Sequence, residues 1–294
     1  MYHDFVAHSS HINSLIFTSD DKHLLSGGFK GELKEWNTSD WSNHLIFIGH
    51  TKTVNSIALY NDDTELISGG GDGFLKFWDR AEAAPKVTFT EQKKGINKLF
   101  VTPDEKYLIS SSPETMMMIR QLPHGEIIKS VKSIAKNINV LAVSPDSKKA
   151  LIGGVGSTLR IYSIPEGKET DEFDAHKKAS LALKFFNEGK NAVSVGYDGE
   201  LNIWNTKGWN IEESIKIGEE GYYGLTMLRD EEHCIVSMPG ALKTINLKKS
   251  EIRGTEDTES KGNYAMAVST KGDLLALGSA DKRIRIWKTE DLLK

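Results

Sequence analysis

A repeat of 42 residues runs through this sequence and constrains its fold more than any other feature. The clearest copy is the stretch 49–79, which opens with Gly-His and ends with Trp-Asp. Within it, the segments 54–59, 65–69 and 74–78 alternate with turn sequences rich in Asn, Asp and Gly, and an Asp-Gly pair is a strong hairpin signal. We therefore expect each copy to form short antiparallel strands whose apolar face a single copy cannot bury.

Further copies lie at the spacing that this period requires. The His and Trp that frame the stretch recur one period earlier as His8 and Trp36, and three periods later as His176 and Trp204. Seven periods of 42 residues equal the 294 residues of the chain. We therefore expect one continuous repeat domain over residues 1–294.

A period of this size with a Gly-His to Trp-Asp frame is typical of propeller blades. At these residues the sequence resembles the WD-repeat (WD40) family, and the resemblance covers the whole chain. It implies an all-β fold, a seven-bladed β-propeller of four-stranded antiparallel blades. Because no complete fourth strand follows Trp287, we expect the N-terminal strand, residues 3–6, to pair into the last blade and close the ring.

The resemblance also implies a buried hydrogen-bonded set of His, Ser, Asp and Trp within a blade. In such a set the Asp accepts from one imidazole nitrogen, the Ser hydroxyl meets the other, and the indole donates to the Ser. Two repeats contain all four residues, which are His50, Ser68, Asp72 and Trp78, and His176, Ser194, Asp198 and Trp204. The first repeat has Lys30 where the Asp is expected. A catalytic triad would need an exposed nucleophile, so we interpret these sets as structural.

A peptide-binding mouth is the third implication of the resemblance, formed at and near a bulge in the first strand of each blade. The corresponding positions of this chain, and hence the predicted partner-binding residues, are Asn13, Phe29, Asn55, Asn97, Asn139, Tyr197, Tyr223 and Tyr264. Aromatic side chains commonly anchor interfaces. Asn is also favoured at a bulge for local reasons, because it tolerates unusual dihedrals and bonds nearby backbone. Both interpretations of the Asn residues stay open.

Composition limits the class of function. The chain has 37 Lys and Arg against 41 Asp and Glu, and a net charge of −4 argues against non-specific binding to nucleic acid. Cys234 is the only cysteine, which rules out an intramolecular disulfide and predicts a reducing, cytoplasmic location. The N-terminus lacks the pattern of a signal peptide, and no apolar run of membrane-spanning length occurs, so we expect no membrane association.

Motifs for catalysis or cofactor binding are weak. The glycine-rich segment 153–157 lacks the Lys of a phosphate-binding loop, and the nine histidines include no His-Glu-x-x-His pattern. A single cysteine cannot build a structural zinc site. We therefore expect no metal, no cofactor and no enzymatic activity.

The leading hypothesis is a non-catalytic protein–protein interaction scaffold, monomeric on its own, that presents its top face to a peptide or protein partner. A first alternative is a constitutive subunit of a larger assembly, bound through the blade rim. A second is a propeller enzyme that acts on a small molecule at the central channel. A third is a substrate receptor of a cullin-type ubiquitin ligase, but that use favours Trp-Asp-x-Arg, whereas Arg80 directly follows Asp79 here.

Overall fold

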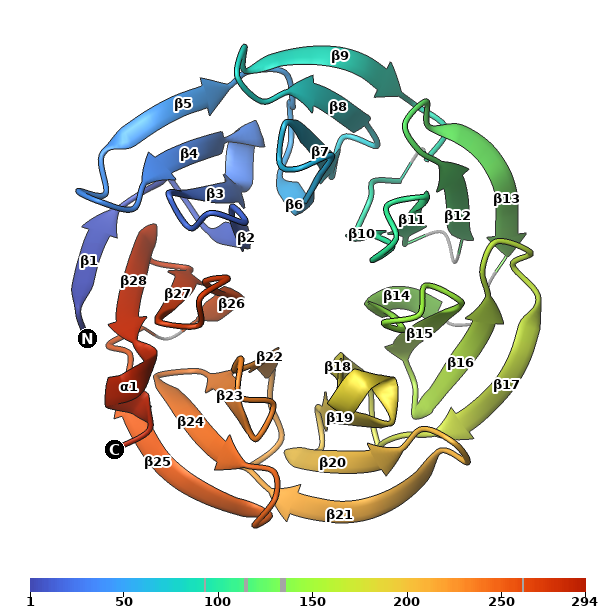
Figure 1. Ribbon diagram of the computed structural model, residues 1–294, viewed down its shortest axis with the longest axis vertical. Coiled ribbons are helices and arrows are strands. Elements are labelled where there is room, and N and C mark those ends of the chain that lie inside the picture. Colours follow the sequence, from blue (N-terminus) through green and yellow to red (C-terminus); the bar gives the residue numbers. More distant parts are fainter. Residues whose placement is uncertain (93, 114–115, 133–135, 261) are drawn as a thin grey trace.

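The computed structural model describes residues 1–92, 94–113, 116–132, 136–260 and 262–294. Its strands form seven antiparallel sheets of four strands each, arranged as blades around a central axis (Figure 1). The first strand of each repeat lies next to the axis, and the last lies at the rim. This is the all-β, seven-bladed propeller that the repeat predicts.

The strands of each blade follow one another from the axis to the rim. Blades one to three contain β2 (Ile12–Phe17), β3 (His23–Gly28), β4 (Leu33–Asn37) and β5 (Asn43–Phe47); β6 (Val54–Tyr60), β7 (Glu65–Gly70), β8 (Leu75–Asp79) and β9 (Ala84–Phe89); and β10 (Lys98–Val101), β11 (Tyr107–Ser112), β12 (Met116–Gln121) and β13 (Glu126–Lys132). Blades four and five contain β14 (Lys136–Val143), β15 (Lys149–Val155), β16 (Thr158–Ser163) and β17 (Glu169–Asp174); and β18 (Ser180–Phe186), β19 (Asn191–Gly196), β20 (Glu200–Asn205) and β21 (Asn210–Lys216). Blades six and seven contain β22 (Gly224–Met227), β23 (His233–Met238), β24 (Ala241–Asn246) and β25 (Glu251–Asp257); and β26 (Asn263–Val268), β27 (Leu274–Ser279), β28 (Arg283–Lys288) and β1 (His3–Val6).

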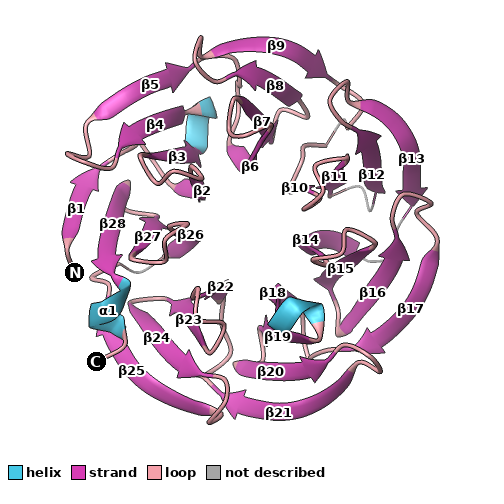
Figure 2. Ribbon diagram, viewed as in Figure 1, coloured by secondary structure: helices cyan, strands magenta, loops and turns pink. Residues whose placement is uncertain are grey.

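Among the described residues, helical structure is confined to short segments, as Figure 2 shows. They are the 3-10 turns Phe29–Gly31 and Asn187–Gly189 and the helix α1 (Thr289–Leu292). Across the part of the chain that the structure describes, no helix has the length and apolar character needed to cross a membrane.

The N-terminal strand completes the seventh blade. Strand β1 pairs antiparallel with β28, with His3 opposite Ile286 and Val6 opposite Arg283. The guanidinium of Arg283 also donates from Nε to the carboxylate of Asp4 at 2.5 Å. The first and last strands of the chain therefore share one sheet, and β28 has no free edge.

The apolar core lies between neighbouring blades rather than within one. In one cluster, Leu33 of blade one packs with Val54 and Trp78 of blade two. Glycine makes this close contact possible, because a Cβ on Gly27 would lie 2.7 Å from Cγ1 of Val54. A Cβ on Gly69 would meet the following blade at 2.5 Å. Each blade thus buries its apolar face only when its neighbour is present.

Two tryptophans at one repeat position fasten the outer strands. Trp41 and Trp209 are buried and share a left-handed backbone, with φ values of 59° and 51°. The ring of Trp209 stacks on Phe173 of the preceding blade with 4.7 Å between centroids, and Trp41 stacks on Phe5 at 6.0 Å. Both side chains therefore act in blade packing, each holding the outermost strand of the blade before it.

Candidate partner-binding site

The end of the ring where the innermost strands begin, here called the top face, contains a hollow of about 460 Å³. Its lining residues are His11, Asn13, Phe29, Thr53, Asn55, Asn97, Lys98 and Tyr264. We refer to this site as the mouth hollow. Five of the eight predicted partner-binding residues line it, and they come from blades one, two, three and seven.

Bulges in the innermost strands place three of these side chains. The pairing of the first and second strands shifts register around Asn13, Asn55 and Tyr264, and again around Leu181. A bulge leaves one residue outside the ladder and re-aims its side chain. The same backbone irregularity therefore delivers amide groups in two blades and a phenol ring in a third.

Two of the asparagines also connect neighbouring blades. The side-chain amide of Asn55 donates to the backbone carbonyl of Ile96 at 2.8 Å, and that of Asn97 donates to Ile138 at 3.2 Å. Among the described residues, neither amide oxygen accepts a hydrogen bond, so each keeps an acceptor for a ligand. The structural and the recognition interpretations of these residues are therefore compatible. The side chain of Asn139 lies outside the part that the structure describes.

Aromatic rings form the other wall of the mouth hollow. Phe29 is 45% exposed and Tyr264 is 55% exposed. The imidazole of His11 lies between them, with its centroid 5.8 Å from that of Phe29 and 5.9 Å from that of Tyr264. Exposed aromatic surface of this kind is what a protein interface commonly uses as an anchor.

A second aromatic group lies outside the mouth hollow and corrects the expectation for Tyr223. Tyr223 is only 8% exposed, because its ring joins the apolar core and its hydroxyl donates to the carbonyl of Glu219. The exposed residue is Tyr222, at 74%, and its ring makes an edge contact with Tyr197 at 5.3 Å. The expectation that the side chain of Tyr223 is exposed to a partner is therefore wrong. The sequence signal for Tyr222 was the adjacent tyrosine pair, of which only one side chain fits the core.

The predicted polar set of blade two is complete. His50 lies 3.0 Å from Asp72 through Nδ1 and 2.7 Å from the Ser68 hydroxyl through Nε2, while the Trp78 indole donates to the same hydroxyl at 2.8 Å. Burial alone would raise the pKa of Asp72, but hydrogen bonds from His50 and from backbone amides lower it to about 2. Ser68 is fully buried, so this arrangement satisfies polar groups and offers no exposed nucleophile.

Blade five repeats the geometry, and blade one varies it. In blade five the distances are 3.2 Å from His176 to Asp198, 2.8 Å from His176 to Ser194, and 2.9 Å from Trp204 to Ser194. In blade one, the carboxylate of Glu32 lies 3.1 Å from Nδ1 of the buried histidine, near the place of the missing Asp, but Nδ1 makes no hydrogen bond among the described residues. Sequence comparison by position missed this substitution, because Glu32 stands two residues beyond the expected place.

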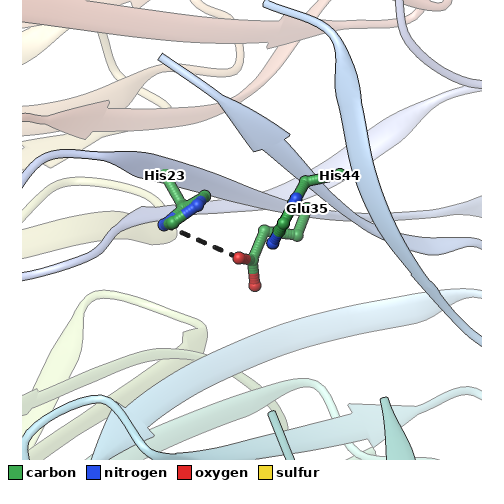
Figure 3. A group of neighbouring side chains, drawn as sticks. All are labelled: His23, Glu35 and His44. Atoms are coloured by element: carbon green, nitrogen blue, oxygen red, sulfur yellow. Dashed lines mark ion pairs between the residues drawn. The ribbon is translucent and has the colours of Figure 1, made fainter. Parts of the chain in front are cut away.

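One group of side chains has the composition of a metal site. His23, Glu35 and His44 each offer a ligand atom within 4.8 Å of the others (Figure 3). However, the guanidinium of Arg80 already donates to both carboxylate oxygens of Glu35, at 2.8 and 2.9 Å, and to Nδ1 of His23 at 3.0 Å. Because the guanidinium of Arg80 already pairs with the carboxylate of Glu35, we interpret the group as an ionic bridge between blades one and two.

Comparisons with known proteins agree with this architecture. A family model described as WD domain, G-beta repeat (WD40) matches residues 1–37, 41–79, 167–205 and 260–288. The chain is also 27% identical over 117 residues to apoptotic protease-activating factor 1 of Rattus norvegicus, a match that covers 39% of this chain and 9% of that much longer relative. The four matched repeats and the seven-bladed ring show that the chain belongs to the WD-repeat (WD40) β-propeller family.

Proposed function

We propose that this protein is a non-catalytic interaction module that presents the mouth hollow to a peptide or protein partner. The observation that carries the proposal is the meeting of two exposed aromatic rings with free amide oxygens around one hollow of about 460 Å³. Similarity to apoptotic protease-activating factor 1 also supports interaction, because that relative is named for an action on another protein.

The chemistry of the mouth hollow suits a peptide. Tyr and Phe supply large, rigid contact surface with little loss of side-chain entropy. An Asn amide offers both a donor and an acceptor to a passing backbone. The size of the hollow falls within the usual range of ligand sites, about 300–1,000 Å³, and accommodates an inserted side chain.

A second candidate is attachment through the rim. Several aliphatic side chains on or next to the outermost strands are exposed, among them Ile46, Ile48, Val87, Ile127 and Ile211. Exposed apolar surface can mark a protein interface. These residues are spread over four blades, whereas the mouth hollow is one concave site, and for this reason we favour the mouth.

The test compares a mouth variant with a matched rim variant. We expect Phe29→Ala combined with Tyr264→Ala to weaken binding of the native partner at least tenfold, because truncated anchors typically cost roughly 2 kcal/mol or more. The melting curve should stay close to wild type, since both rings are exposed. Tyr2→Ala, which removes an exposed tyrosine from the seventh blade, should leave binding unchanged.

Partners are first identified by affinity capture and quantitative mass spectrometry with wild type and both variants. The dissociation constant of each candidate is then measured by calorimetry with purified proteins. Binding that survives the mouth substitutions but is lost with Ile46→Ser and Ile48→Ser would make the mouth proposal wrong and support the rim. Tyr223→Ala is unsuitable for this test, because Tyr223 is part of the core.

A further inference from the structure

The central channel carries positive charge in a protein whose net charge is negative. Two cavities of about 560 and 580 Å³ follow the axis below the mouth hollow and are lined by the innermost strands. The charged side chains of this lining are Lys98, Lys184 and Arg229. No Asp or Glu is among the described residues that line either cavity, although acidic residues outnumber basic ones in the chain by 41 to 37.

The two lysines are exceptions at their repeat positions. Lys98 directly follows a bulge position, where the other six blades have Ser14, Ser56, Val140, Ala182, Gly224 and Ala265. Lys184 lies two positions further along its strand, where the other blades have Ile16, Ala58, Phe100, Ala142, Thr226 and Ala267. The fold is thus built with small or apolar residues at these places, and packing does not require a lysine.

Neither ammonium group has a partner within the part of the chain that the structure describes. Both side chains are exposed to solvent, and both line the cavity that the innermost strands form around the axis. Desolvation lowers the pKa of Lys98 and of Lys184, and the charge of Lys184 lowers that of Lys98 further. Two like charges that repel each other in an enclosed space favour a bound anion.

The channel is continuous with the mouth hollow. Asn13, Asn55, Lys98 and Tyr264 line both the hollow and the upper cavity. An anion can therefore reach Lys98 from the top face, past side-chain amides that can donate further hydrogen bonds.

We propose that the central channel is a binding site for a dianionic phosphoryl group, with Lys98 and Lys184 as its cationic ligands. A phosphoryl group carries a charge of about −1.5 to −2 at neutral pH, which matches two ammonium groups better than a single carboxylate does. The group can arrive as free inorganic phosphate or on a phosphorylated side chain of a ligand at the mouth. The free-anion form of this site does not depend on any partner at the mouth hollow.

The first experiment measures binding of inorganic phosphate to the full chain by isothermal titration calorimetry, with chloride at equal ionic strength as reference. We expect saturable binding to wild type. For Lys98→Met combined with Lys184→Met, we expect a dissociation constant at least tenfold higher. Lys106→Met, which removes an exposed lysine from the same blade as Lys98, should bind like wild type. Equal phosphate binding by wild type and the double variant would overturn the proposal.

Thermal unfolding without phosphate distinguishes a binding role from a structural one. The double variant should melt at the same temperature as wild type or higher, because it removes unpaired charges that repel each other. Added phosphate should raise the melting temperature of wild type but not that of the variant. A lower melting temperature of the variant in chloride would contradict the proposal. If that variant does not fold, Lys98→Arg with Lys184→Arg keeps both charges and must retain binding.

The source of the phosphoryl group is decided by a second pair of titrations. A short peptide with one phosphoserine is compared with inorganic phosphate, each with wild type and with the Phe29→Ala, Tyr264→Ala variant. Tighter binding of the phosphopeptide that the mouth variant abolishes indicates a group delivered by a peptide. Phosphate binding that the mouth variant leaves unchanged indicates a free anion, and it persists even if the mouth proposal fails.

Discussion

At the residue scale, a buried histidine in three blades shows how polar groups are satisfied inside the propeller. His50 and His176 each meet a carboxylate through one ring nitrogen and a serine through the other. His8 keeps the serine, and Glu32 supplies its carboxylate from a different position. A carboxylate can therefore approach the histidine from a different position, but only the Asp residues of blades two and five make a hydrogen bond to it.

Removing one of these histidines should be costly. We expect His50→Ala to lower the free energy of unfolding by about 1–3 kcal/mol, because Asp72 and Ser68 lose a partner while buried. Gln92→Ala at the corresponding place in blade three should cost less, since neither amide atom of Gln92 has a partner among the described residues. Urea denaturation of both variants measures the difference. A larger loss for Gln92→Ala than for His50→Ala would contradict this account.

The burial of His8 should make the stability of the protein depend on pH. Burial, reinforced by Lys34, lowers the pKa of His8 from 6.5 to about 4, against the opposing effect of Glu32. In the unfolded chain His8 therefore becomes protonated below pH 6.5, whereas in the folded chain it stays neutral down to about pH 4. Stability from this group is fully present above pH 6.5 and falls by at most about 3 kcal/mol as the pH drops to 4.

This loss can be isolated with two variants. His8→Gln should show a smaller decrease in the free energy of unfolding between pH 7 and pH 4.5 than wild type, measured by denaturation at each pH. His124→Gln removes an exposed histidine and should keep the wild-type slope. Identical slopes for wild type and His8→Gln would show that His8 does not contribute to acid sensitivity.

At the scale of elements, the outermost strands depend on side chains from the next blade. Strand β1 is held by its pairing with β28, by the ion pair of Asp4 with Arg283, and by the stacking of Phe5 on Trp41. The equivalent contact of Phe173 with Trp209 fastens β17 to blade five. A fourth strand is thus part of two neighbouring units.

Deletion of residues 1–7 should lower the melting temperature substantially and promote aggregation. The deletion exposes the edge of β28, and an open strand edge can pair with other chains. It also uncovers Trp41, which is buried in the intact ring. Calorimetry and light scattering measure both effects, with deletion of Met1 alone as the control. A melting temperature equal to that of the control would show that β1 does not stabilise the ring.

At the scale of the whole molecule, the seven blades share one architecture but differ in whether their buried polar side chains have hydrogen-bond partners. Blades two and five contain the complete polar set, whereas in blade one Glu32 lies close to His8 but leaves its Nδ1 without a hydrogen bond among the described residues. In blade three, Gln92 and Ser110 contain buried polar atoms without a partner among the described residues. We therefore expect the ring to open unevenly.

Hydrogen exchange followed by mass spectrometry should detect this difference. We expect faster amide exchange in residues 92–165 and 218–260 than in residues 50–80 and 176–205, because blades with satisfied interiors open less often. Blade one, residues 8–37, should exchange as slowly as the second group if the carboxylate of Glu32 stabilises its histidine. Uniform protection across all blades would contradict the ranking.

The sequence by itself determined the repeat, and with it the backbone position of every equivalent residue. The period of 42 residues predicted seven repeats, and the resemblance to the WD-repeat family at their framing residues implied the polar sets of His50 and His176 and the bulge positions that reach the mouth hollow. These features are local, because strand pairing and hydrogen bonds within one blade depend on residues close together in the repeat.

Only the tertiary structure decided which side chains remain exposed to a ligand or partner. Tyr223 enters the core between blades five and six while Tyr222 stays outside, a choice set by the space that neighbouring side chains leave. Glu32 reaches the histidine of blade one only because the turn after β3 brings it there. Lys98 and Lys184 are far apart in sequence and line one channel only when the ring closes, without a partner among the residues that the structure describes. Exposure and charge around the axis are properties of seven blades together, and no single repeat contains them.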